Sequence, residues 1–88
     1  MPFEFDPAKS ASNKIKHGID FIEAQAIWMD EKRVEFNLPT LTEPRYQMLG
    51  LIHNKVWSAI ITYRGENIRL ISVRPARRDE RNLYHDDH

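Results

Sequence analysis

The chain is 88 residues long, has a formal net charge of zero and contains no cysteine, and 41% of its residues are hydrophobic. This length provides for one domain with one core, and the lack of cysteine excludes a disulfide framework and thiolate metal sites. The acidic start of the chain lacks the basic and apolar segments of a signal peptide, and no apolar run reaches the roughly 18 residues that cross a bilayer. We therefore expect one cytoplasmic domain, residues 1–88, with no membrane partner.

The first 30 residues predict a short strand followed by two helices. Residues 3–5 alternate between apolar and acidic side chains, as a strand does. Asp6-Pro7 combines an N-cap residue with a proline in the first helical turn, and Gly18 is suited to end the helix that follows. Asp20 begins a second helix with one apolar face. Because only a short connection joins the two helices, they should pack as neighbours.

The remainder of the chain predicts four strands and a closing helix. Alternating or β-branched apolar residues indicate the strands, and Pro75 ends the last one. The strands are expected over residues 33–38, 46–52, 56–63 and 67–74, and the helix over residues 76–84. Consecutive hairpins give an antiparallel sheet, whose apolar face must be covered by helices. The expected fold class is α+β, with an antiparallel four-stranded sheet, two N-terminal helices and a C-terminal helix.

The basic residues are concentrated in the second half of the chain. Residues 1–44 hold eight acidic and five basic side chains, whereas residues 45–84 hold three acidic and eight basic ones. Arginines prominent in the second stretch are Arg64, Arg69, Arg74, Arg77, Arg78 and Arg81. Because the planar guanidinium binds phosphate oxygens in pairs, this segment indicates a localised anion site. The alternative is a solvated surface with scattered ion pairs.

The closing segment also carries groups for acid–base chemistry. The strand period places Ser72 and Arg74 on one face and Arg69 on the other, unless a bulge intervenes. The helical period gathers four polar side chains on one face: Arg77, Glu80, Arg81 and Tyr84. Cleavage of RNA without a metal needs a base, an acid and cations near the phosphate, and this face can supply all three. In the alternative interpretation, Glu80 only pairs with a neighbour on an exposed helix.

Several residues outside this segment have two interpretations each. His17 is suited to act as a general base, but it also stands where its ring can hydrogen-bond to the end of its own helix. Lys14 either reaches a phosphate or is solvated. Tyr46 and Tyr63 either stack on RNA bases or pack on the sheet. The histidines form no metal-ligand pair on a helix, and there is no glycine-rich phosphate loop, so we expect no metal and no cofactor.

Two separated groups of residues resemble the signatures of BrnT-family toxins. The opening group is Phe3-Glu4-Phe5-Asp6, Lys9, Asn13, Lys16-His17-Gly18, Phe21 and Glu23-Ala24, and the closing group is Ile68-Arg69-Leu70-Ile71-Ser72-Val73-Arg74, Glu80-Arg81 and Tyr84. Together they span nearly the whole chain in the right order. Pro75 departs from the pattern, because a basic residue is common there, and Arg77 stands where a threonine helix cap is common.

The resemblance implies a RelE-like fold and an RNA-cleaving toxin that halts translation. It also implies an antitoxin of the BrnA type, whose ribbon-helix-helix part binds operator DNA, and a complex of two toxins with two antitoxins. The candidate catalytic residues that it highlights are Arg69, Ser72, Arg74, Glu80 and Tyr84. The candidate RNA-binding residues are Lys14, His17, Arg64, Arg77 and Arg81.

We therefore expect a metal-independent endoribonuclease. In this reaction the 2′-hydroxyl attacks its own phosphodiester and leaves a 2′,3′-cyclic phosphate and a 5′-hydroxyl end. Arg74 and Arg69 would neutralise the phosphate and Ser72 would hold it. Glu80 is the expected base, and Tyr84 the expected acid or orienting group. The alternatives are a non-catalytic module that binds the antitoxin and modulates operon repression, and a plain nucleic-acid binder whose affinity falls steeply with salt.

Overall fold

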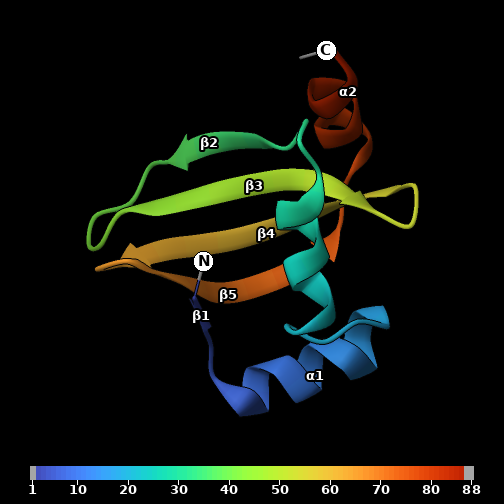
Figure 1. Ribbon diagram of the computed structural model, residues 1–88. Coiled ribbons are helices and arrows are strands. Elements are labelled where there is room, and N and C mark those ends of the chain that lie inside the picture. Colours follow the sequence, from blue (N-terminus) through green and yellow to red (C-terminus); the bar gives the residue numbers. More distant parts are fainter. Residues whose placement is uncertain (1, 87–88) are drawn as a thin grey trace.

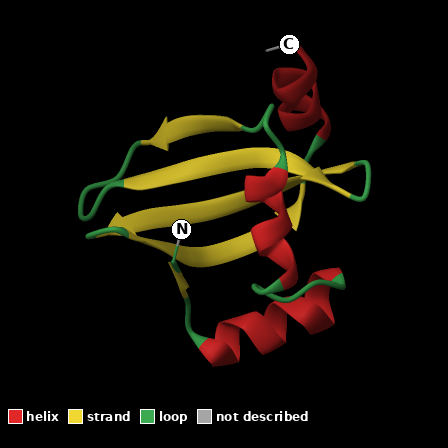
Figure 2. Ribbon diagram, in the orientation of Figure 1, coloured by secondary structure: helices red, strands yellow, loops and turns green. Residues whose placement is uncertain are grey.

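The computed structural model describes residues 2–86 and shows a five-stranded sheet with helices on both of its faces (Figures 1 and 2). The elements are β1 (Phe3–Glu4), α1 (Pro7–His17), the 3-10 helix η1 (Glu23–Met29), β2 (Val34–Leu38), β3 (Arg45–Ile52), β4 (Lys55–Arg64), β5 (Asn67–Pro75) and α2 (Arg78–Asp86). The predicted α+β class is confirmed, and β2 to β5 follow the four predicted hairpin strands. No helix among the described residues is long and apolar enough to cross a membrane.

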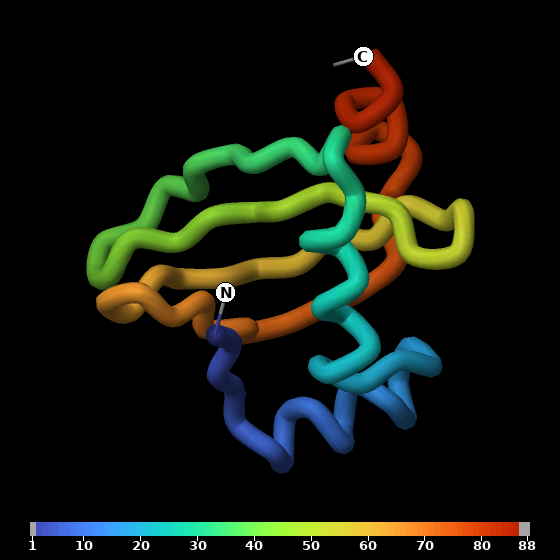
Figure 3. The backbone as a smooth tube through the Cα atoms, viewed as in Figure 1, coloured from blue at the N-terminus to red at the C-terminus, as the bar shows by residue number. Residues whose placement is uncertain are grey.

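The prediction of a four-stranded, purely antiparallel sheet is wrong, because β1 adds a fifth strand in parallel. The strand order is β1-β5-β4-β3-β2, with Phe3 opposite Ile68 and Glu4 opposite Arg69. The N–H of Ile68 donates to the carbonyl of Pro2 at 3.0 Å. In Figure 3 the blue start of the chain lies beside the orange β5. This pairing joins residues from opposite ends of the chain, so no local pattern could have predicted it.

The prediction of two N-terminal α-helices is also wrong, because only α1 is an α-helix and the second is the 3-10 helix η1. Asp20 does begin this segment: its Oδ1 accepts from the N–H groups of Ile22 and Glu23. The buried residues of η1 are Ala24 and Ile27, which are three positions apart. That spacing matches three residues per turn, so packing against the sheet favours the tighter helix.

Two cores lie on the two faces of the sheet. The larger lies between the sheet and the segment that contains η1, and its buried residues are Phe21, Ala24, Ile27, Met48, Ile52, Trp57, Ala59, Ile61, Ile68, Leu70 and Val73. The smaller lies under α2 and consists of Val34, Leu49, Val56, Ala76 and Tyr84. Helix α1 contacts β5, whereas α2 contacts β3 and β4. The end of β5 that carries Arg74 lies between α1, which contacts this strand, and α2, whose Glu80 pairs with Arg74.

The ends of α1 are set by the residues that the sequence indicated. The Asp6 carboxylate accepts from the N–H of Ala8 at 2.9 Å, and Pro7 occupies the first turn. Gly18 ends the helix with φ of 90°, a left-handed conformation that favours glycine. Its N–H donates to the carbonyl of Lys14 at 2.9 Å. The end of α1 is therefore capped by backbone groups.

Candidate active site

Three candidate residues share one face of β5 because this strand contains a bulge. The pairing register with β4 shifts near the middle of the strand and leaves Ile71 as an extra residue. The shift reverses the alternation of faces, so Arg69 lies on the same face as Ser72 and Arg74. Their partners occupy every second position of β4 and are Thr62, Ile60 and Ser58. The bulge that the sequence analysis named as the condition for Arg69 to share a face with Arg74 is therefore present in β5.

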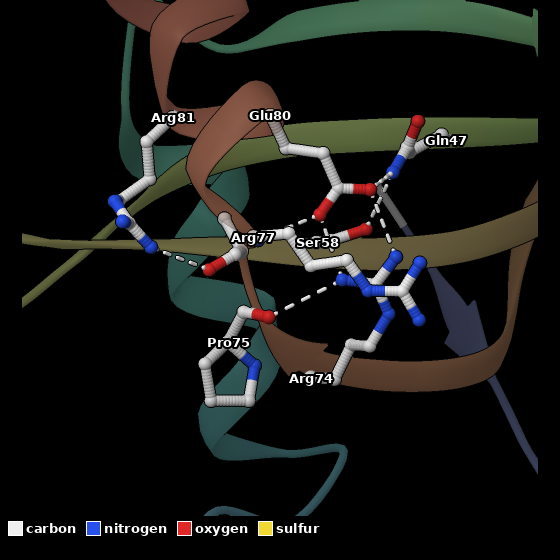
Figure 4. Close-up of polar contacts among 8 residues, drawn as sticks. Gln47, Ser58, Arg74, Pro75, Arg77, Glu80 and Arg81 are labelled. Carbon is white, nitrogen blue, oxygen red and sulfur yellow. Dashed lines mark hydrogen bonds and ion pairs between the residues drawn. The ribbon is translucent and has the colours of Figure 1, made fainter.

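Arg74 and Glu80 form a bidentate ion pair that joins β5 to α2 (Figure 4). Nη1 and Nη2 of Arg74 lie 2.7 Å and 2.8 Å from Oε1 and Oε2 of Glu80. The exposed fraction is 29% for the Arg74 side chain and 10% for that of Glu80. The hydrogen-bonded guanidinium is the main cause that lowers the pKa of Glu80 to about 2, although burial opposes it. Glu80 is therefore ionised at neutral pH and fixes the plane of the Arg74 guanidinium.

Two further donors hold the Glu80 carboxylate. The backbone N–H of Arg77 donates to Oε1 at 2.8 Å, and Nε2 of Gln47 donates to Oε2 at 2.6 Å. The first contact is half of a capping box, because Arg77 precedes α2 and Glu80 is the third residue of that helix. With Arg74 included, each carboxylate oxygen accepts from two donors. A carboxylate so occupied, with a pKa of about 2, is a weak base at neutral pH.

A pocket of about 210 Å³ lies between α1 and β5. β1 pairs only with the first half of β5, so it leaves this part of the strand edge to α1. Asn13 fixes α1 there, because its Oδ1 accepts from the N–H of Val73 at 3.4 Å and its Nδ2 donates to the carbonyl of Ile19 at 3.0 Å. The lining residues are Lys9, Ser12, Asn13, Lys16, His17, Phe21, Ile71, Ser72, Val73 and Arg74.

The pocket is cationic. Lys9, Lys16 and Arg74 contribute positive charge, and none of the lining residues is acidic. His17 adds an imidazole, the side-chain group best suited to exchange a proton near neutral pH. The His17 ring makes no hydrogen bond with any residue among 2–86. It therefore does not cap its own helix, which ends on the backbone N–H of Gly18. Ser72 supplies a hydroxyl. These groups together can bind a phosphate and move a proton beside it.

Lys9, Ser12 and Lys16 line the pocket on α1 but were not among the predicted site residues. A signal for them was present. Together with Asn13 they follow a helical spacing of three, four and seven residues, which places them on one face of α1. Lys9 and Lys16 also belong to the residues that resemble the BrnT signature. The density of arginines indicated only the strand side of the pocket, and the lysines of α1 form the other side.

The structure does not bring Tyr84 to this pocket. Tyr84 is 2% exposed, packs in the smaller core and donates a hydrogen bond to Oδ2 of Asp30. Burial, followed by this hydrogen bond to a carboxylate, raises the pKa of Tyr84 to about 12. Asp30 also accepts from the N–H of Leu51. Tyr84 thus ties α2 to the segment that follows η1.

Most of the candidate RNA-binding residues lie outside the pocket lining. Lys14 pairs with Glu23 at 2.7 Å, and this ion pair is about half exposed. Arg81 donates to the carbonyl of Ala76 at 3.0 Å and so supports the start of α2. The Arg77 side chain is exposed beside the Glu80 contact. Of this predicted group, only His17 lines the pocket.

Arg64 and Arg69 share an acidic partner at the paired half of β5. The Nε of Arg64 and the Nη1 of Arg69 each lie 3.5 Å from Oε1 of Glu4. Asn67 donates to the other oxygen of this carboxylate at 3.0 Å and is the main cause that lowers the pKa of Glu4. Arg69 therefore shares a face with Arg74 but is held by β1, away from the pocket lining.

Tyr46 and Tyr63 pack against each other on the sheet. Their ring centroids are 5.1 Å apart, and the Tyr63 hydroxyl donates to Glu35 at 2.7 Å. Trp28, with Tyr63, lines a separate groove on the face that carries the larger core. The tyrosines are therefore not part of the pocket between α1 and β5.

The fold and the pocket define a small α+β protein with a cation-lined cleft at the edge of its sheet, a site suited to a phosphate-containing ligand. The family model described as "Ribonuclease toxin, BrnT, of type II toxin-antitoxin system" matches residues 5–80. The chain therefore belongs to the BrnT family of ribonuclease toxins, and a type II system implies an antitoxin partner. A comparison with curated proteins gave no match.

Proposed function

We propose that this BrnT-family protein is a metal-independent endoribonuclease that cleaves RNA in the pocket between α1 and β5. The observation that supports this is the composition of the pocket: Arg74, two lysines and His17 line it, and no carboxylate does. A phosphodiester carries one negative charge. A second negative charge develops on the phosphate oxygens as the 2′-oxygen attacks, so fixed cations stabilise the transition state. Imidazole supplies the proton transfer without a metal.

The proposed reaction begins with attack of the 2′-oxygen on the adjacent phosphorus. His17 takes the proton of the 2′-hydroxyl, the bond from phosphorus to the 5′-oxygen breaks, and the 5′-oxygen receives a proton from solvent. The products are a 2′,3′-cyclic phosphate and a 5′-hydroxyl end. Arg74 binds the phosphate oxygens, and Ser72 donates its hydroxyl to them.

Glu80 takes a different role in this proposal from the one that the sequence suggested. Both of its oxygens are held by donors, and its pKa is about 2, so it orients Arg74 instead of accepting the substrate proton. Tyr84 is also left out of the chemistry, because its hydroxyl is held by Asp30. The Glu80 contacts fix the orientation of the Arg74 guanidinium before RNA binds. Less conformational entropy is therefore lost when this guanidinium binds the phosphate.

The test is cleavage of a defined RNA by the purified protein in EDTA. We expect cleavage with cyclic phosphate ends, loss of at least about a hundredfold in rate for Arg74→Ala and for His17→Ala, and no change for Arg78→Ala. Arg78 is a matched control, because it is exposed on α2 and does not line the pocket. Cleavage that needs an added divalent ion, or an Arg74→Ala protein as active as the parent, would refute the proposal. A protein that binds its antitoxin but never cleaves RNA would be the non-catalytic module.

The proposed partner is a BrnA-type antitoxin with a ribbon-helix-helix part. Family membership supports the existence of an antitoxin, and the BrnA type follows from the resemblance. We propose a cytoplasmic complex of two toxins and two antitoxins, which contacts operator DNA through the antitoxin. Co-expression with the neighbouring reading frame should restore growth and yield a complex of that mass by light scattering. Rescue by a protein of another class, or a complex of one toxin with one antitoxin, would contradict this.

A further inference from the structure

Gln47 joins three elements beneath the candidate active site. It lies on β3, and its single Nε2 group donates both to Oγ of Ser58 at 2.9 Å and to Oε2 of Glu80 at 2.6 Å (Figure 4). Ser58 is 1% exposed and stands opposite Arg74 in the β4–β5 register. Both hydrogens of the Gln47 amide are thus used, one on the sheet and one on α2.

The contacts of Gln47 complete a symmetric arrangement around Glu80. Oε1 accepts from Arg74 and from the Arg77 backbone, and Oε2 accepts from Arg74 and from Gln47. An arginine–carboxylate pair alone can swing as a unit, since both side chains have several rotatable bonds. The Arg77 N–H just before α2 and the Gln47 amide on β3, one on each oxygen, prevent that motion. The neutral amide adds a donor without adding a charge that would compete with Arg74.

We propose that Gln47 is a positioning residue for RNA cleavage, which fixes the Glu80 carboxylate and through it the Arg74 guanidinium. This inference rests on the proposed function of Arg74 as the phosphate-binding group. Gln47 does not line the pocket, so it acts without touching the substrate. A misplacement of about 1 Å in a group that binds the reacting phosphate lowers rates by up to about a hundredfold, so loosening Arg74 should be visible in the kinetics.

The first test compares Gln47→Met with Gln25→Met. Both substitutions replace an amide by a thioether of similar length, but Gln25 lies on η1 beside a separate groove. We expect kcat/KM for RNA to fall about tenfold for Gln47→Met and to stay unchanged for Gln25→Met. Affinity for a 2′-methoxy RNA, which cannot be cleaved, gives the second readout. In the Arg74→Ala background, Gln47→Met should cause no further loss of affinity, because the two residues act as one unit.

The second test is Gln47→Glu, which keeps the size and polarity of the side chain. The introduced carboxyl faces Glu80 on α2 and Arg74 on β5, while Asp79 also acts on Arg74. Two carboxylates at hydrogen-bond distance repel each other, which raises the pKa at which the pair binds one proton. Once protonated, the introduced carboxyl can again donate to Glu80. Activity relative to the parent protein should therefore be low at pH 7 and recover toward pH 5. Where tryptophan fluorescence shows the variant folded at both pH values, a role in stability alone would give no such pH profile.

The outcomes separate this inference from the proposed function. If Arg74→Ala abolishes cleavage while Gln47→Met and Gln47→Glu cleave like the parent protein, Gln47 has no positioning role and the proposed function stands. If Gln47→Met weakens RNA binding equally with and without Arg74, it acts independently of Arg74 and the inference is overturned. If Arg74→Ala itself remains active, the proposed function fails first and the inference fails with it.

Discussion

Replacing Glu80 by glutamine should destabilise the protein by roughly 3 kcal/mol at pH 7. The pKa of Glu80 lies at about 2 instead of 4.5, and each unit of such a shift corresponds to about 1.4 kcal/mol of stability. Both partners of the ion pair are less than one third exposed, so solvent screens the interaction only in part. Glutamine keeps the size of the side chain but leaves the partly buried Arg74 without its counter-charge.

The loss should depend on pH in a defined direction. The folded-state pKa of Glu80 is lowered, so the stabilisation is fully present above pH 4.5 and is lost as the pH falls toward 2. The difference in unfolding free energy between the parent protein and Glu80→Gln should therefore be constant from pH 7 to about pH 5 and shrink below pH 4.5. Its sign follows because the unfolded chain binds the proton more readily than the folded one.

Urea unfolding followed by tryptophan fluorescence measures this difference at each pH. Glu66→Gln is the matched control, because Glu66 is exposed and makes no ion pair with the other described residues. The control should follow the parent protein across the whole range. A gap of the same size at pH 7 and pH 3, or a gap below about 0.5 kcal/mol at pH 7, would refute the assignment of Glu80 as the fixed partner of Arg74.

Three further predictions follow from single contacts. Tyr84→Phe should lower the unfolding free energy by about 1–2 kcal/mol in urea titrations, because Asp30 loses a hydroxyl donor. RNA cleavage should stay intact, and a variant that folds normally but no longer cleaves RNA would place Tyr84 in the active site. Gly50→Ala should cost about 1–3 kcal/mol, because its Cβ would stand 2.8 Å from Cγ2 of Ile27, and a Tm equal to that of the parent would contradict this packing. Lys14→Ala should leave the cleavage rate unchanged, because Lys14 lies outside the pocket lining, and a large loss of rate would place it in the RNA path.

Local sequence determined much of the fold. The Asp6-Pro7 start and the Gly18 end set the limits of α1, because caps act within one helical turn. The alternation along β2 to β5 and the turns between them set the hairpins, because strand pairing of chain neighbours needs only a short loop. The family could also be inferred, because its signatures are runs of adjacent residues, and the match over residues 5–80 confirms it.

The site was predictable only in part. The arginines and Glu80 of the closing segment stood out by their density, but the pairing that fixes Glu80 depends on Gln47 from a distant strand. Lys16 and His17 enter the pocket because Asn13 holds α1 against β5, which is a contact across most of the chain. Tyr84 matched a helical face in the sequence, yet packing directs it into the smaller core.

The sequence by itself therefore determined what neighbours within a few positions can decide: the ends of α1, the hairpins, the α+β class and the residue types available for chemistry. Tertiary structure alone decided the parallel β1–β5 pair, the bulge at Ile71 that moves Arg69 to the face of Arg74, and the surroundings of Glu80. The physical reason is that burial and hydrogen bonding between distant segments exist only after the chain has closed large loops, and their strength depends on packing that no local pattern encodes.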